Sequence, residues 1–155
     1  MIELTLVDII VRIAMAVGLG ALLGVERTLA GKTAGLRTYA MVSLGSCLFI
    51  IISQIVSLNN INLFSFDPLR IGAQIIAGIG FIGAGLVILK DNKIVGLTTA
   101  AGIWVSSGIG MACGFGLFSI AVVALISAIV IFTVFWLLEK LLRKINYDAI
   151  DGEGK

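Results

Sequence analysis

Three glycines near the middle of the chain have the spacing of a phosphate-binding turn. The stretch AGIGFIGAG, residues 77–85, contains Gly78, Gly80 and Gly83 in the pattern GxGxxG. Such a turn binds a dinucleotide when it joins a strand to a helix and when an acidic residue about 20 positions later holds the ribose. Here an uncharged apolar run surrounds the glycines, and the residue at that later position is Ile103. The surroundings exclude a dinucleotide site, so these glycines need another explanation.

Ionisable side chains inside apolar runs are the other candidates for chemistry. Asp8 and Arg12 lie one helical turn apart, which is the spacing of an ion pair within a helix. Asp67 and Arg70 flank the start of a later apolar run and form a second candidate pair. A charge within a membrane span is costly and is a candidate for function. Two interpretations stay open: the charges neutralise one another or extend outward to water, or they line a polar vestibule. That vestibule would comprise Asp8, Arg12, Gln54, Asp67 and Gln74.

The composition indicates a membrane protein. The 155 residues are 59% hydrophobic and 13% charged, whereas a soluble domain has about 25% charged residues. Because the chain has no histidine, it lacks the commonest general base and transition-metal ligand, and we expect no enzyme. The net charge of +2, with no basic face, gives no reason to expect nucleic acid as a partner.

Five apolar segments are long enough to cross the hydrocarbon core of a bilayer, which takes about 20 helical residues. The sequence therefore predicts an all-α fold, a polytopic membrane helix bundle. The five transmembrane helices would cover about 5–25, 38–57, 69–89, 94–113 and 117–137. Residues 1–145 would form this single domain, and 146–155 a short polar cytoplasmic tail. Cys47 and Cys113 fall at different predicted depths, so we expect no disulfide.

Basic residues predict the orientation of the bundle, because lysine and arginine near span ends favour the cytoplasm. They occur in the first loop, in the third loop and after the fifth span, whereas the second and fourth loops have none. These residues are Arg27, Lys32, Arg37, Lys90, Lys93, Lys140, Arg143 and Lys144. The N-terminus would therefore lie outside and the C-terminus in the cytoplasm.

Small residues recur at every fourth position in the first and fourth predicted spans. Gly20 is in line with Gly24, and Gly102 is in line with Gly110. Such patterns let membrane helices approach closely. We predict helix contacts, in a tight bundle or a homo-oligomer, at Gly20, Gly24, Gly78, Gly80, Gly83, Gly85, Gly102 and Gly110. The glycines of the third span would pack beside GLTTAA, residues 96–101. The alternative is that glycines let a helix unwind around a bound ion.

Four motifs together resemble one family of bacterial membrane proteins. They are GLGALLGVER (18–27), AGLRTYAMVSLG (34–45), DPLRIGAQIIAGIGFIGAG (67–85) and GLTTAAGIWVSSGIG (96–110). In order and spacing, over about residues 8–125, they are similar to the membrane domain of the MgtC/SapB family. The resemblance identifies as motif positions Glu26, Arg27, Gly35, Leu36, Arg37, Thr38, Asp67, Arg70, Gln74, the glycines of 78–85, Gly96, Thr98, Thr99 and Trp104.

The resemblance implies a bacterial inner-membrane (plasma-membrane) protein connected with magnesium limitation and stress adaptation, with survival of pathogenic members inside phagocytes, and with restraint of the F-type ATP synthase. Its expected partners are the lipid bilayer, further copies of itself in a homo-oligomer, and another membrane protein that it modulates without catalysis. An oligomeric conduit for magnesium, protons or a small solute is the alternative. No cofactor is expected, and magnesium is a candidate ligand without an assigned metal site.

The chain also departs from the family pattern. Longer members continue into a soluble domain after the last span, so we expect no regulation through such a domain within this chain. Thr98 stands where virulence-associated members have asparagine, and Val105 stands where they have cysteine. The resemblance therefore extends to the fold but not to the virulence role.

Overall fold

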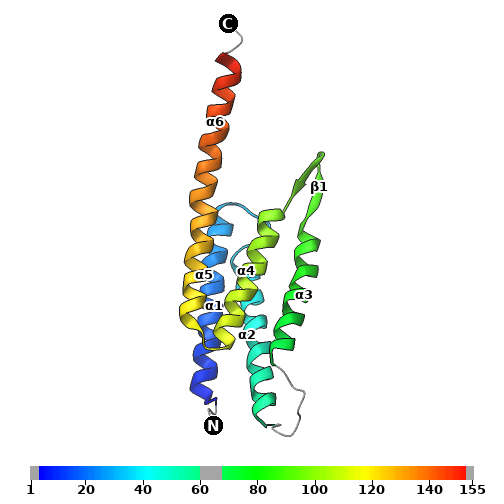
Figure 1. The fold of residues 1–155 in the computed structure, drawn as a ribbon, viewed down its shortest axis with the longest axis vertical. Coiled ribbons are helices and arrows are strands. Elements are labelled where there is room, and N and C mark those ends of the chain that lie inside the picture. Colours follow the sequence, from blue (N-terminus) through cyan, green and yellow to red (C-terminus); the bar gives the residue numbers. More distant parts are fainter. Residues whose placement is uncertain (1–3, 60–67, 153–155) are drawn as a thin grey trace.

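The computed structural model describes residues 4–59 and 68–152, and almost all of them are helical (Figure 1). The elements in chain order are α1 (Leu6–Leu29), α2 (Leu36–Asn59), α3 (Pro68–Leu86), β1 (Ile88–Lys90), β2 (Lys93–Val95), α4 (Leu97–Gly114), α5 (Phe118–Val130), η1 (Ile131–Phe135) and α6 (Trp136–Gly152). The all-α helix bundle expected from the sequence is confirmed. Segments of α1, α2 and the continuous α5–η1–α6 helix are long and apolar enough to cross a membrane.

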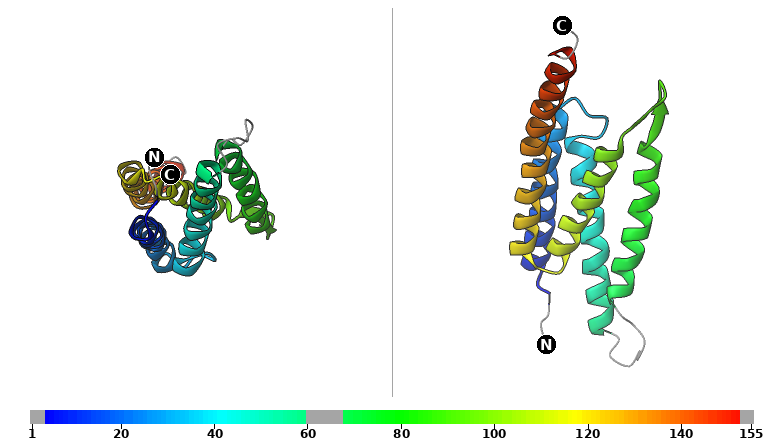
Figure 2. Two further views of the ribbon diagram at one scale, coloured as in Figure 1. Left: turned by 90° about the horizontal axis from the view of Figure 1, so that it is seen from below. Right: turned by 45° about the horizontal axis from the view of Figure 1, so that its top comes forward.

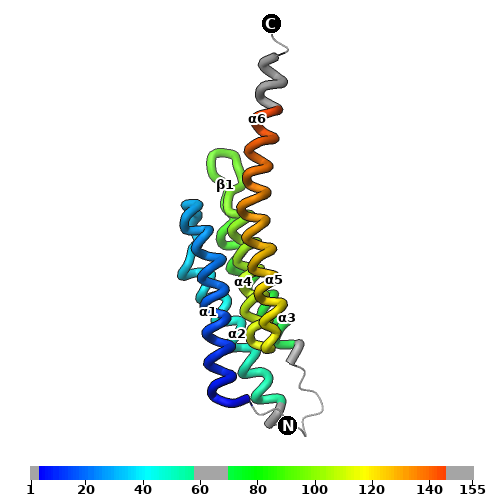
Figure 3. Tube along the Cα trace, turned by 90° about the vertical axis from the view of Figure 1, so that its left-hand side faces the viewer, coloured from blue at the N-terminus to red at the C-terminus, as the bar shows by residue number. Residues whose placement is uncertain are grey.

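The helices run side by side with the two chain ends at opposite ends of the bundle (Figure 1). The turn between α1 and α2 and the β1–β2 hairpin lie at the end from which α6 projects (Figure 1 and Figure 3). The fold therefore gathers the basic loops at one end, called the inner end below, as the charge pattern requires. The other end is called the outer end. Which end faces the cytoplasm stays a prediction.

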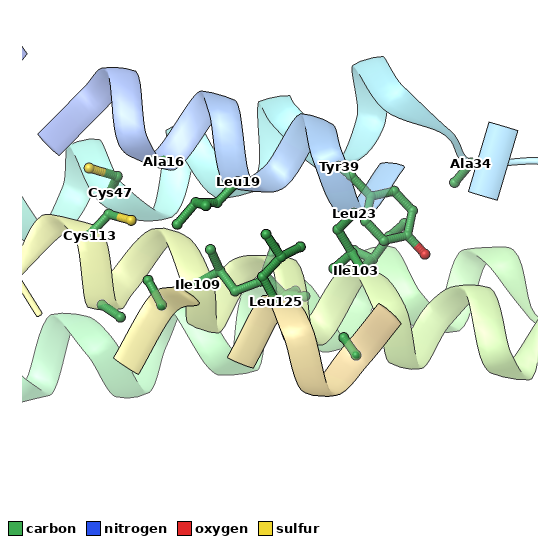
Figure 4. Packing of buried hydrophobic residues seen from close by; sticks show 14 of the residues in the cluster. Ala16, Leu19, Leu23, Ala34, Tyr39, Cys47, Ile103, Ile109, Cys113 and Leu125 are labelled. Atoms are coloured by element: carbon green, nitrogen blue, oxygen red, sulfur yellow. The ribbon is translucent and has the colours of Figure 1, made fainter. Parts of the chain in front are cut away.

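Helix α2 packs closely on both α1 and α4, which also contact each other. Glycines make this possible, because a Cβ on Gly20 would lie 2.7 Å from the Ser43 Cβ, and one on Gly114 would lie 2.7 Å from the Ile50 Cβ. Gly110 rests directly on the backbone of Ser43. Figure 4 shows the side chains that fill the space around these contacts. Helix α3 lies at one edge of the bundle (Figure 2) and packs mainly on α4.

A β-hairpin separates α3 from α4, where the predicted spans left only a short loop. The spans were expected to end at 89 and to begin again at 94, but the helices end at Leu86 and begin at Leu97. Lys90 pairs with Lys93, and the two turn residues have positive φ, at 51° for Asp91 and 59° for Asn92. Two successive residues with positive φ form the tight turn that matches the twist of a hairpin.

The last helix is longer than predicted. It continues through η1, a single π-helical turn that we call the wide turn, and through α6 to Gly152. It projects beyond the other helices (Figure 1 and Figure 3). The span predicted at 117–137 and the first part of the tail predicted at 146–155 thus belong to one continuous helix.

Candidate functional site

Arg12 binds the end of α4 at the outer end of the bundle. Its Nη1 atom donates hydrogen bonds to Gln54 Oε1 at 2.7 Å and to the Gly114 carbonyl oxygen at 2.6 Å. Gly114 is the last residue of α4, and the C-terminus of a helix carries partial negative charge. Gly116, with φ of 76°, leaves room beside the guanidinium: a Cβ there would lie 3.2 Å from Arg12 Nη2. Arg12 therefore joins α1, α2 and α4.

The predicted ion pair between Asp8 and Arg12 is wrong. The Asp8 carboxylate instead accepts hydrogen bonds from Thr5 Oγ1 at 2.7 Å and from the Thr5 backbone N–H at 3.1 Å. The Asp8 backbone N–H donates to Thr5 Oγ1 at 3.2 Å, which completes a capping box. This box satisfies backbone donors that the start of any helix leaves free. The signal was in the sequence, since Thr5 precedes Asp8 by three positions.

The predicted polar vestibule does not form as one site. Arg12 and Gln54 meet, whereas Asp8 is exposed at the start of α1. Gln74 is exposed on α3, where it lines a different cavity. Asp67 lies outside the described residues, so its pairing with the exposed Arg70 stays a prediction.

Arg27 lies at the inner end of α1 and is only 4% exposed. Its Nε atom donates to the carboxylate of Glu26, and its guanidinium carbon lies 3.6 Å from the ring centroid of Phe132. A cation above an aromatic face gains more when it is shielded from water, as this one is. Sequence reasoning identified Glu26 and Arg27 but missed Phe132.

The wide turn η1 supplies Phe132 to this cluster. Within η1, Thr133 Oγ1 donates to the Ile129 carbonyl oxygen at 2.7 Å, a bond that competes with regular helix geometry. Phe132 then reaches α4, where a Cβ on Gly102 would lie 2.7 Å from its Cζ atom. Single π-helical turns are frequent at functional sites. No pattern in the sequence marks this turn, which is why Phe132 was missed.

The fourth-span motif has several different roles. Tyr39 donates from its hydroxyl to the Thr99 carbonyl oxygen at 3.3 Å, while the Thr98 side chain is exposed. Gly96 has φ of 93° and rests against Leu86 where the hairpin returns to the bundle. Trp104 is 53% exposed on the outside of α4. Arg37, at the start of α2, is exposed as well.

A cavity of about 800 Å³ opens beside Arg27. Its polar lining comes from α1, from the turn after it, from the start of α4, from η1 and from α6: Glu26, Arg27, Lys32, Thr98, Thr133 and Glu139. We call it the inner-end cavity. Among residues 4–59 and 68–152, no three His, Cys, Asp or Glu side chains come together to hold a metal ion. The cavity therefore combines cationic and anionic groups in a way that suits binding by charge.

The glycines of α3 divide into two groups. A Cβ on Gly83 would lie 3.6 Å from the Ala100 Cβ, so Gly83 packs on α4 beside residues 96–101 as expected. Gly78, Gly80 and Gly85 have no atom of the described chain within 4 Å of such a Cβ. These three therefore make no close helix contact within the described part of the bundle, and their predicted contact in a homo-oligomer stays a prediction.

The two cysteines are both free and buried. A Cβ on Gly114, the neighbour of Cys113, would lie 2.9 Å from the Cys47 carbonyl oxygen, and Figure 4 shows the two cysteines at the same level, so the different depths predicted for them are wrong. Helix α2 begins at Leu36 and helix α4 begins only at Leu97, which shifts the two helices relative to the predicted spans.

Comparison with known proteins agrees with these motifs. The family model described as the MgtC family matches residues 13–142. The chain is 39% identical over 145 residues to "Putative magnesium transporter YhiD" of Escherichia coli K12, covering 90% of this chain and 66% of that one. It is 40% identical over 146 residues to MgtC of Salmonella typhimurium LT2, covering 94% of this chain and 59% of that one. It is 39% identical over 132 residues to MgtC of Brucella abortus 2308, covering 85% and 52%.

The chain thus spans less than two thirds of the length of these relatives. No solved structure matches it. The match to the family model begins directly after Arg12, includes the Arg27 cluster and ends within α6. This chain belongs to the MgtC family.

Proposed function

We propose that this protein is a non-catalytic modulator of another protein of the bacterial inner membrane, in a process connected with magnesium limitation or stress adaptation. Membership of the MgtC family supports the connection, and the printed name of the Escherichia coli relative mentions magnesium. The observation that carries the proposal is one side of α3 that the rest of the described chain leaves uncovered.

This side, called the α3 face, consists of three small residues, one glutamine and one phenylalanine. Gln74, Ala77, Gly78, Phe81 and Gly85 are all exposed, and Phe81 is 83% exposed. Membrane helices associate through small residues that allow close approach and through polar side chains that bond across the contact. The α3 face offers both, so a helix of a second membrane protein would pack on it better than lipid does.

The other glycine-rich surfaces are already occupied. Gly20, Gly24 and Gly110 all contact α2 closely. Substitution at these positions would disrupt the bundle itself and would report nothing about a partner. The partner surface is therefore assigned to α3 rather than to α1 or α4.

The test is co-purification in a mild detergent from bacterial membranes, with the F-type ATP synthase as the first partner examined, as the family resemblance suggests. We expect Gly78→Leu to reduce partner recovery about tenfold, since a bulky side chain prevents close helix approach. Gly108→Leu is the matched control, because Gly108 is an exposed glycine on α4 whose added Cβ would meet no described atom within 4 Å. Equal recovery with both variants would overturn the assignment to α3. Loss of self-association alone would identify a homo-oligomer contact instead.

An oligomeric conduit is the alternative function, and the printed name of YhiD is the observation that favours it. Magnesium prefers oxygen ligands with carboxylates among them. In the outer half of the described spans, Arg12 is a cation and therefore does not bind magnesium. The Asp8 carboxylate already accepts a hydrogen bond from Thr5. Magnesium flux into liposomes that contain the purified protein tests the conduit, with Arg12→Gln as the variant. Flux above that of empty liposomes would replace the modulator proposal.

A further inference from the structure

The inner-end cavity lies at the level where the last helix leaves the apolar part of the bundle. Glu139 is the first charged residue of the chain after Lys93. Ile131, which also lines the cavity, precedes it by about 12 Å along the helix axis. Trp136 lies between them and is 57% exposed, and tryptophan is enriched at membrane–water boundaries. The cavity therefore lies at this boundary, with both apolar and charged side chains in its lining.

Lys32 is held in place by the turn between α1 and α2. The Lys32 backbone N–H donates to the Arg27 carbonyl oxygen at 3.0 Å, and Gly31 adopts φ of 64° to allow it. Thr28 Oγ1 closes the same turn, since it accepts a hydrogen bond from the Leu36 backbone N–H at 3.0 Å. The backbone of Lys32 is thus fixed by this turn, and Lys32 belongs to the lining of the cavity.

The charges of the cavity leave one cationic and one anionic side chain for a ligand. Glu26 and Arg27 pair with each other, so their charges are balanced before any ligand binds. Lys32 on the α1–α2 turn and Glu139 on α6 remain, and neither forms an ion pair with another described residue. A ligand that spans from one to the other needs an anionic group and a cationic group.

A ligand in the inner-end cavity would also contact apolar side chains. Leu29 is 83% exposed, Ile131 is 50% exposed and Phe135 is 53% exposed, and all three line the cavity. Large apolar side chains at a membrane boundary contact acyl chains. The volume of about 800 Å³ falls within the range of about 300–1,000 Å³ typical of ligand sites.

We propose that the inner-end cavity binds a phospholipid with a phosphoethanolamine headgroup. Lys32 binds the phosphate, and the Glu139 carboxylate accepts hydrogen bonds from the ammonium group, which has three N–H donors. The acyl chains lie against Ile131 and Phe135. An anionic headgroup would bring an unbalanced charge to Glu139, whereas the zwitterion matches both side chains. The bound lipid would connect the α1–α2 turn to the last helix.

The experiment uses the full chain, purified in a mild detergent, with native mass spectrometry to count bound lipids and tryptophan fluorescence to follow thermal unfolding. Phosphatidylethanolamine, phosphatidylcholine and phosphatidylglycerol with identical acyl chains are compared. We expect phosphatidylethanolamine to bind about tenfold more tightly than the other two, because only its ammonium group donates N–H bonds to Glu139. Free phosphoethanolamine at the same concentration should not change the unfolding temperature.

Charge exchange tests the two named residues. Lys32→Glu and Glu139→Lys should each weaken phosphatidylethanolamine binding about tenfold, and the double exchange should restore most of it with the headgroup reversed. Lys90→Glu is the matched control, because Lys90 is exposed at the same end of the bundle without lining the cavity.

Unfolding of each variant without lipid shows whether it folds, and both exchanged side chains are exposed. Equal binding of phosphatidylcholine or phosphatidylglycerol, an unchanged affinity in Glu139→Lys, or an equal response to free phosphoethanolamine would each overturn the proposal.

Discussion

The core around α2 and the α3 edge of the bundle are both rich in glycine, but the glycines do different things. In the core, Gly20 and Gly110 bring α1 and α4 against α2, so closely that a single added carbon would overlap Ser43. At the edge, Gly78 and Gly80 have no described neighbour within 4 Å of an added Cβ. The same residue type therefore fixes a helix contact in one region and leaves a free surface in the other. Spacing alone does not tell these two cases apart.

The largest expected effect is that of Gly110→Ala. The new Cβ would overlap the Ser43 backbone, which cannot move without displacing α2, so we expect a loss of about 3 kcal/mol or more in unfolding free energy. Gly108→Ala, two positions earlier on the same helix, adds a carbon that meets no atom of the described chain within 4 Å. It should be neutral or stabilising. Fluorescence-detected size exclusion gives the folded fraction of each variant. Equal folded fractions would contradict the close contact between α4 and α2.

A second comparison uses the arginines of the two regions. Arg12→Met removes two hydrogen bonds from the guanidinium, to Gln54 and to the Gly114 carbonyl oxygen. We expect a loss of about 2 kcal/mol, because bonds to a charged donor are stronger than neutral ones. Arg70→Met, at an exposed position on α3, should change stability by less than about 0.5 kcal/mol. Thermal unfolding in detergent measures both. A similar shift for the two variants would show that Arg12 does not join the three helices.

A third comparison uses two phenylalanines. Phe132→Leu removes the ring that lies 3.6 Å from the Arg27 guanidinium carbon, and we expect a loss of about 1 kcal/mol or more. Phe81→Leu on the α3 face should have little effect on the isolated protein, since Phe81 is 83% exposed. The same unfolding measurement applies, with Arg27→Met combined with Phe132→Leu in a double-mutant cycle, because methionine removes the cation. If the two losses of unfolding free energy simply add, Arg27 and Phe132 do not stabilise each other.

The sequence predicted which residues are small and which spans are apolar, but not which helices would meet. The ladder through Gly20 and the ladder through Gly110 both contact α2, because α2 packs on α1 and on α4. The sequence of one span does not show which other helix packs on it, and that packing decides which side of the helix is buried. That is why Gly83 packs beside α4 as predicted, whereas Gly80 meets no atom of the described chain within 4 Å of an added Cβ.

Local features other than helical periodicity account for the other differences between the prediction and the structure. The spacing of Thr5 and Asp8 fits a capping box. The spacing of Asp8 and Arg12 also fits an ion pair, and spacing alone does not decide between the two. The turn at Asp91 and Asn92 lies between two apolar runs that also fit the ends of membrane spans. The wide turn that presents Phe132 depends on a side-chain bond of Thr133, which no periodicity reveals.

The smallest expected effect is the most informative about the α3 edge. Gly80→Ala should stabilise the isolated protein by about 0.5–1 kcal/mol, because alanine is the better helix former and the added carbon meets no described neighbour. Gly83→Ala should give a similar or slightly smaller gain, since its Cβ would lie at an ordinary contact distance of 3.6 Å from the Ala100 Cβ. Unfolding in detergent and proteolysis in native membranes together measure both variants. A gain in detergent that becomes a loss in the membrane for Gly80→Ala, but not for Gly83→Ala, would show that another helix lies against this edge. A gain in both settings would show that lipid covers Gly80, and the contact with a partner would then be confined to the side of α3 that carries Gly78.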